Sequence, residues 1–118
     1  MRCWAGLCGL MLGLCLPAAA HAQTTAGRWL DNYDQADQRT RSFHHIQILG
    51  TYDGIAWVVA SQKGDAAICV PGQLVLEQGQ LVSLLRNFVT RTDRSFADKP
   101  FGYALFAALR FTFPCKRS

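Results

Sequence analysis

Two cysteines bracket the best-patterned part of this 118-residue chain, and this arrangement limits what the chain can fold into. Cys69 opens a Cys-Val-Pro segment, and Cys115 closes a Phe-Pro-Cys segment near the end. Between them lie two stretches that have the periodicity of amphipathic helices. A bridge between these cysteines would staple the two helices as a hairpin at its open end.

The first 22 residues have the three regions of a secretory signal peptide in the expected order. Arg2 precedes an apolar run that reaches Leu16, and small residues then lead to Ala22. The run is short for a membrane span, which takes ~20 residues. We therefore expect residues 1–22 to be a cleaved signal peptide. Residues 23–118 are expected to form one small periplasmic domain without membrane attachment.

Removal of the leader takes three of the five cysteines with it, so that Cys69 and Cys115 remain as the only pair. In an oxidising compartment such a pair is expected to form a disulfide. The bridge would close a loop of about 47 residues, and chain-entropy estimates value that closure at roughly 4 kcal/mol. The competing interpretation is a reactive free thiol at Cys69, which requires the cysteine to be unpaired.

The expected mature chain carries eleven basic and eight acidic residues, a formal charge of +3 over 96 residues. So small a net charge, spread over 96 residues, is not typical of a nucleic-acid-binding surface. The basic residues of the chain also lack the interleaved aromatic residues of a protein that binds single strands. The sequence has no phosphate-binding glycine motif and no recognisable metal-ligand motif. We therefore expect neither nucleic-acid binding nor a cofactor.

The start of the expected domain predicts one short helix. Residues 23–27 are polar and are expected to be a frayed start. Trp29, Leu30 and Tyr33 follow with helical spacing and would seed a helix that packs on the rest of the domain.

A long second helix is predicted from about residue 37 to residue 60. Its apolar residues recur at steps of four, three and four, namely Ile48, Tyr52, Ile55 and Val59. Gly50 and Gly54 weaken this pattern, so that a kinked or strand-like alternative stays open for residues 46–59. If the helix forms, the glycines are expected to mark the close approach of a neighbouring helix. Their face, where exposed, would also allow a homodimer.

Two further helices complete the predicted fold. The first spans about residues 77–90 and has a core-facing stripe of Leu81, Leu84, Leu85, Phe88 and Val89. The second follows Asp98, an expected N-cap, and Pro100, and it ends before Pro114. Its apolar face consists of Phe101, Ala104, Leu105, Ala108 and Leu109. The predicted fold is all-α, a small disulfide-stapled bundle of about four helices whose last two run antiparallel.

The polar connection between the last two helices carries Arg91, Asp93, Arg94, Phe96 and Lys99. An aromatic side chain flanked by arginines on an exposed loop has the composition of a binding hot spot. We therefore predict these five residues as the partner-binding site. The competing interpretation places Phe96 under the loop as a local core residue, with the charges in solvent.

Two other groups of polar residues lack the arrangement that a metal site or a catalytic site requires. The adjacent His44 and His45 would point roughly 100° apart on a helix, so they would rarely ligate one metal ion together. Asp31, Asp34 and Asp37 are three apart and predict a solvated acidic face rather than a pair of carboxylates in a cleft. We expect no catalytic residue and no metal ligand, so that the protein is not an enzyme.

A series of short motifs runs through the second half of the chain. They are Cys69-x-Pro71, Gln80-Leu81-Val82 leading into Leu84-Leu85 and Phe88-Val89, Ala104-Leu105, Ala108-Leu109, and Phe113-Pro114-Cys115. Over about residues 46–115 this series resembles the Rap/Tai family of immunity proteins. Tyr52-Asp53-Gly54 is similar to the aromatic-glycine segment of that family's preceding helix. The chain departs from the family in having no second, upstream cysteine pair in the expected mature part. It also has Thr92-Asp93 where a His-Pro pair is common.

The resemblance implies a small exported helical domain that protects bacteria from a peptidoglycan amidase delivered by type VI secretion. By this analogy the protein binds an NlpC-type cysteine amidase and occludes its substrate cleft, which requires no catalytic residue of its own. The alternative is a periplasmic acid-stress chaperone, also a small helical domain with one disulfide, or another protein-binding module of the envelope.

Overall fold

The computed structural model describes residues 23–62 and 67–116, so that the expected signal peptide lies outside the described residues. The long helices are α1 (Ala26–Gln35), α2 (Gln38–Ser61), α3 (Gln78–Asn87) and α4 (Phe101–Thr112). A π-helical turn, η1 (Phe88–Thr92), and a 3-10 helix, η2 (Arg94–Asp98), connect α3 to α4. These ranges contain no β-strand, and the predicted all-α fold with about four helices is confirmed. None of the described helices is long and apolar enough to cross a membrane.

Each of the first two helices begins at a side-chain cap. The Thr25 hydroxyl accepts a hydrogen bond from the Arg28 amide at 3.3 Å. The Asp37 carboxylate accepts one from the Thr40 amide at 2.7 Å, and this bond lowers the pKa of Asp37. From this cap α2 continues as one helix to Ser61, so the strand-like alternative for residues 46–59 is wrong.

The core lies where α1, α3 and α4 meet one side of α2. The predicted apolar face of α4 is buried in full, and Leu105 and Leu109 are inaccessible to solvent. Trp29 of α1 stacks on Phe101 with ring centroids 4.5 Å apart, and its indole nitrogen donates to Gln47 Oε1 at 2.8 Å. The buried apolar residues are Ala26, Trp29, Leu30, Ile48, Ile68, Leu76, Leu81, Val82, Leu85, Phe88, Val89, Phe101, Ala104, Leu105, Ala108 and Leu109.

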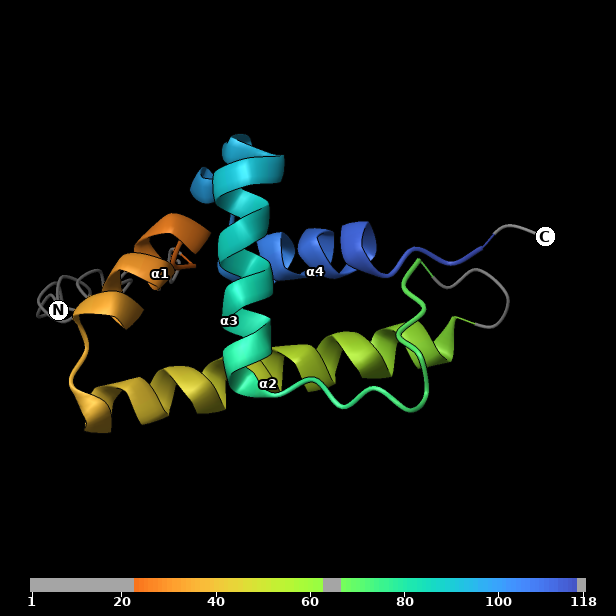
Figure 1. Cartoon of the computed structure of the whole chain (residues 1–118), viewed down its shortest axis with the longest axis horizontal. Coiled ribbons are helices and arrows are strands. Elements are labelled where there is room, and N and C mark those ends of the chain that lie inside the picture. Colours follow the sequence, from red (N-terminus) through yellow and green to blue (C-terminus); the bar gives the residue numbers. More distant parts are fainter. Residues whose placement is uncertain (1–22, 63–66, 117–118) are drawn as a thin grey trace, which may run out of the picture.

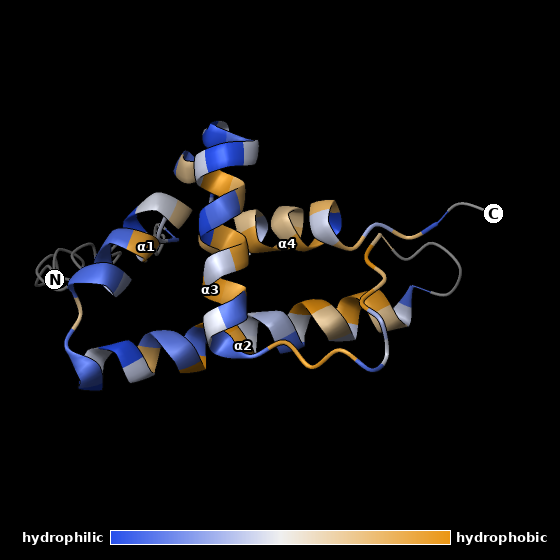
Figure 2. Ribbon diagram, in the orientation of Figure 1, coloured by the Kyte–Doolittle hydropathy of each residue, from blue (hydrophilic) through white to orange (hydrophobic). Residues whose placement is uncertain are grey.

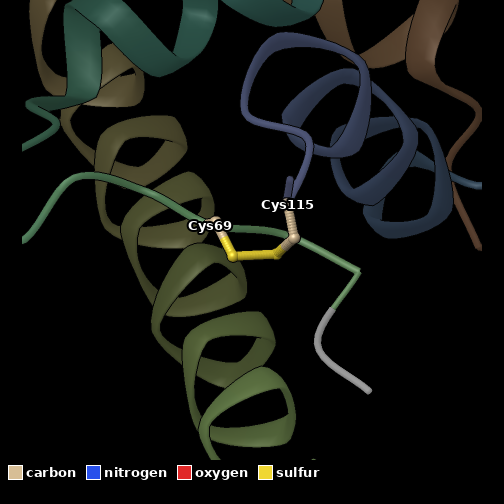
Figure 3. Close-up of a disulfide and its surroundings, with 2 residues drawn as sticks. All are labelled: Cys69 and Cys115. Carbon is tan, nitrogen blue, oxygen red and sulfur yellow. A yellow bond between two sulfur atoms is a disulfide. The ribbon is translucent and has the colours of Figure 1, made fainter. Parts of the chain in front are cut away.

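The predicted disulfide between Cys69 and Cys115 is present, with Cα atoms 4.8 Å apart and a sequence separation of 46. The Cys69 amide also donates to the Phe113 carbonyl at 2.8 Å, so that the two chain segments are joined by the backbone as well. Figure 3 shows the bridge beside α2, between the segment that follows α2 and the segment that follows α4. The disulfide therefore ties together the chain beyond the C-terminal ends of α2 and α4.

The predicted antiparallel hairpin is wrong in its geometry. Figure 1 shows α3 running across α2 and α4 instead of alongside α4. An extended segment after Cys69 leads the chain back to the start of α3, and Leu76 on this segment is buried. The Glu77 amide then donates to Gln80 Oε1 at 2.9 Å as α3 begins. The cysteines meet because α2 and α4 end near each other, which the helical periodicity of α3 and α4 could not indicate.

Among the described residues, Gly50 and Gly54 do not mark contact with another helix. A Cβ atom built on either glycine would have no atom of these residues within 4 Å. The expectation of close intramolecular approach is therefore wrong. Each glycine costs the helix about 1 kcal/mol relative to alanine, and packing within the described chain offers no compensation.

Candidate protein-binding surface

The predicted binding residues lie at the junction of α3 and α4, in residues 88–99, which we call the tip. Figure 1 shows the tip at the end of α3 that is remote from α2. The tip is regular structure rather than an open loop. Asp93 ends the π-helical turn by donating its amide to the Phe88 carbonyl at 2.9 Å. Its carboxylate then caps η2 by accepting from the Ser95 amide at 3.1 Å and the Ser95 hydroxyl at 2.6 Å.

The N-terminal segment of the described chain holds the base of the tip. The Ala26 amide donates to the Lys99 carbonyl at 2.9 Å, and the Phe101 amide donates to the Thr24 carbonyl at 2.9 Å. The expectation of a frayed start over residues 23–27 is therefore wrong. A short polar segment gives no apolar signal, so the sequence did not indicate that it would be pinned by backbone hydrogen bonds to a distant residue.

Phe96 is half-buried and packs inside the tip. Its ring makes an edge-on contact with Phe88 at a centroid distance of 5.1 Å and a tilted contact with Tyr103 at 5.4 Å. These contacts favour the interpretation of Phe96 as a local core residue over that of an exposed anchor. Phe96 therefore helps to fix the shape of the tip.

The basic residues of the tip differ from Asp93 and Phe96 in their exposure to solvent. Arg91, Arg94 and Lys99 are exposed, and the Arg94 side chain is oriented by a hydrogen bond from Nε to the Thr90 carbonyl at 3.2 Å. Asp98 does not cap α4 as expected, because η2 ends at Asp98 and the N-cap position of α4 is Pro100. The five predicted residues thus divide into three exposed cations and two residues, Asp93 and Phe96, that build the scaffold.

A groove beside the tip was not expected from the sequence. It has a volume of about 490 Å³ and is lined by Gly79, Gln80, Ser83, Leu84, Asn87, Phe88, Thr92, Phe111 and Thr112. The Phe111 side chain is 64% exposed on its rim and lies 5.9 Å from the Phe88 ring. The sequence signal was the placement of Phe111 outside the apolar face of α4. The groove and the cations of the tip together form the candidate surface.

Two of the three spaced aspartates, Asp34 in α1 and Asp37 after it, have structural roles. Asp34 accepts two hydrogen bonds from the Arg86 guanidinium, at 2.8 Å and 2.6 Å, and so joins α1 to α3. These bonds from Arg86 hold the pKa of the Asp34 carboxyl below its ordinary value, and they raise the pKa of Arg86. Asp37 caps α2, whereas Asp31 is exposed as predicted.

The adjacent histidines pack at the joint between α1 and α2. His45 Nε2 lies 2.9 Å from the Tyr33 hydroxyl, and His44 Nδ1 lies 3.0 Å from the Thr40 carbonyl. The His44 ring also meets the edge of Trp29 at a centroid distance of 5.3 Å. Among the residues that the structure describes, no group of three or more histidines, cysteines or acids could hold a metal ion. Both histidines therefore contribute contacts between helices.

Comparisons of the chain with protein-family models, with curated proteins and with solved structures gave no match. The geometry of the described residues and the sequence motifs are thus the basis for a functional proposal.

Proposed function

We propose that this protein is a periplasmic immunity protein that binds a peptidoglycan amidase toxin of the NlpC type and blocks its substrate cleft. The observation that carries the proposal is a preorganised tip that presents Arg91, Arg94 and Lys99 beside an open groove. The motif series around Cys69 and Cys115 resembles that of the Rap/Tai immunity proteins, and this resemblance indicates an amidase toxin as the partner.

Preorganisation supports a role in tight binding. A loop that is already ordered loses less conformational entropy when a partner binds. Here three restraints act together, namely the Asp93 cap, the buried side of Phe96, and the hydrogen bonds from the N-terminal segment. A steric block of this kind requires the inhibitor to keep its shape and to supply no chemistry, so we propose a function without catalysis.

The test is inhibition of a purified NlpC-type amidase, with peptidoglycan hydrolysis as the readout. The double variant Arg91→Glu/Arg94→Glu should weaken inhibition at least ~10-fold, because arginines are frequent energetic anchors of interfaces. The matched control is Arg39→Glu/Arg110→Glu, which makes the same change of charge at two exposed arginines outside the tip. Full inhibition by the tip variant would contradict the proposed contact surface. Absence of any complex with such an amidase would contradict the function.

An acid-stress chaperone or another envelope binding module is the second candidate. The observation that favours it is the exposure of large apolar side chains, among them Phe43, Trp57 and Val75. A chaperone of this kind should expose further apolar surface when carboxylates are protonated. Dye binding and protection of a client protein, followed from about pH 7 to pH 3, separate the two candidates. An unchanged response over this range would eliminate the chaperone.

A further inference from the structure

The tip contains a π-helical turn, η1, and such turns are rare in proteins and frequent at functional sites. The Asp93 amide donates to the Phe88 carbonyl at 2.9 Å, five residues earlier in the chain, whereas an α-helix joins residues four apart. The turn therefore holds one residue more than an α-helical turn. As a result, a carbonyl group at this end of the helix can lose its regular amide donor.

The Thr90 carbonyl is such a group. In a continuous α-helix it would accept a hydrogen bond from the amide of residue 94. Among the described residues no backbone amide donates to the Thr90 carbonyl, and the Arg94 side chain takes that place by donating from Nε at 3.2 Å. This hydrogen bond orients the guanidinium group of Arg94 on the π-helical turn.

The hydrogen bond from Nε leaves the far end of the Arg94 guanidinium free. The N–H groups on Nη1 and Nη2 form a planar fork that matches the two oxygens of a carboxylate. Within the described residues the Arg94 side chain makes no other hydrogen bond and no ion pair, and it is exposed to solvent. The fork is therefore available to an acceptor on another molecule.

Arg86 shows in the same chain what such a fork binds. Its Nη1 and Nη2 atoms donate to the two carboxylate oxygens of Asp34, at 2.8 Å and 2.6 Å. Arg94 presents the same donors without a carboxylate. The neighbouring Asp93 does not supply one, because its carboxylate is turned to η2 and accepts from the amide and hydroxyl of Ser95.

The other charges of the tip favour an acidic partner. Arg91 and Lys99 are also exposed and form no ion pair within the described residues. Asp98 is the one exposed acidic residue of the tip. Figure 2 shows mostly hydrophilic residues where α3 passes into the tip. An excess of exposed cations attracts a negatively charged surface and repels a positively charged one, so the partner surface that fits the tip is acidic.

We propose that Arg94 determines the specificity of the tip by binding an aspartate or glutamate carboxylate of the partner protein, end-on through Nη1 and Nη2. The inference rests on the proposed function, since it takes the amidase toxin as the partner and adds the chemistry of the contact. A guanidinium group that is already oriented loses less conformational entropy on binding than a free side chain. Lysine at this position would keep the charge but would lose the planar fork.

The first experiment compares conservative variants in binding to a purified NlpC-type amidase, measured by calorimetry. Arg94→Lys should weaken binding at least ~10-fold, because it leaves the partner carboxylate without its paired donors. Arg91→Lys makes the same change at an exposed arginine that no hydrogen bond within the described residues orients, and it should weaken binding less than ~3-fold. Arg39→Lys, outside the tip, should have no effect.

The outcomes separate the inference from the proposed function. Equal losses for Arg94→Lys and Arg91→Lys would overturn the inference but not the proposed function, because the complex would still form. Absence of any complex with the wild-type protein would overturn the proposed function, and the inference with it. Thermal unfolding is the control for the fold, since an exposed substitution should change Tm by less than about 3 °C.

A double-mutant cycle identifies the carboxylate and separates recognition from a structural role of Arg94. Exposed acidic residues around the substrate cleft of the amidase are replaced one at a time by their amides. One replacement should weaken binding of the wild-type protein at least ~10-fold and binding of Arg94→Ala less than ~2-fold, because its carboxylate has no fork left to bind. Additive effects for every acidic residue tested would show that Arg94 binds none of them, and the inference would be wrong.

Discussion

Trp29 and Trp57 belong to two regions of the domain with opposite packing. Trp29 is 1% exposed between α1 and α4, where it stacks on Phe101 and donates to Gln47. Trp57 is 80% exposed on the outer face of α2. The same residue type thus serves intramolecular packing in one region and has no such role in the other. The difference shows that the residue type alone does not determine whether an aromatic side chain of this domain is buried.

Truncation of the two tryptophans should give the largest difference in the free energy of unfolding and is the strongest test of this comparison. Trp29→Ala should lower the free energy of unfolding by about 4 to 5 kcal/mol, because it leaves a cavity and removes a ring stack and a hydrogen bond. Trp57→Ala should change it by less than about 0.5 kcal/mol, because the Trp57 side chain is mostly exposed. Urea unfolding measures both. Similar losses for the two variants would contradict the contrast.

Removal of the disulfide should have the next largest effect. Cys69→Ser/Cys115→Ser should destabilise the protein by about 4 kcal/mol, because it frees a closed loop of about 47 residues in the unfolded chain. The structure adds that Ile68, Cys69 and Val70 line the same pocket as Ile55 and Val59 of α2. Amide hydrogen exchange should therefore accelerate more over the second half of α2 than in α1. Uniform acceleration across both helices would contradict the role assigned to the bridge.

Replacement of two helical glycines by alanine should change the stability of the protein in opposite directions, depending on which face of the domain each glycine occupies. Gly54→Ala should stabilise the protein by about 1 kcal/mol, since alanine favours the helix and its Cβ would meet no atom of the described residues within 4 Å. Gly27→Ala should destabilise it, because the new Cβ would lie 3.2 Å from the Ala97 carbonyl oxygen of η2. Thermal unfolding of the two variants gives the signs. Stabilisation by Gly27→Ala would show that the contact between α1 and η2 is loose.

The smallest expected effect concerns the ion pair that joins α1 to α3. A carboxyl whose pKa is lowered in the folded state stabilises that state above its unfolded pKa of about 3.9, and the contribution is lost as pH falls below that value. Because Asp34 and Arg86 are partly exposed, Asp34→Asn should cost only about 0.5 kcal/mol at pH 7. Near pH 2 the variant and the wild type should be equally stable. Asp53→Asn serves as the control, and an undiminished difference at pH 2 would contradict the assignment.

The prediction of the helices succeeded where apolar spacing was regular. The buried faces of α3 and α4 include Leu81, Leu85 and Leu105, all of which lie on the predicted stripes. Helix ends were less predictable, because they depend on local hydrogen bonds. Aspartate is a common N-cap residue, yet η2 extends to Asp98 and α4 begins only after Pro100.

The candidate binding surface was predicted only in composition. Arg91 and Arg94 could be singled out as cations near an aromatic residue, and both are exposed. The groove could not be foreseen, because it arises where α3 and the end of α4 cross, and the angle of that crossing has no signature in either helix alone. Thr24 and Ala26 restrain the tip through backbone hydrogen bonds, and the pattern of side chains in the sequence does not indicate such bonds.

The amino-acid sequence by itself determined the helical class, most apolar residues of the core and the identity of the cysteine pair, because apolar periodicity and the number of cysteines can be read without the fold. Only the tertiary structure decided that α3 crosses its neighbours, that Phe96 turns inward and that Trp57 remains exposed. These outcomes depend on which faces of distant elements meet. An apolar residue carries the same hydrophobic driving force wherever it stands, and only the fold determines whether its partner lies within the chain.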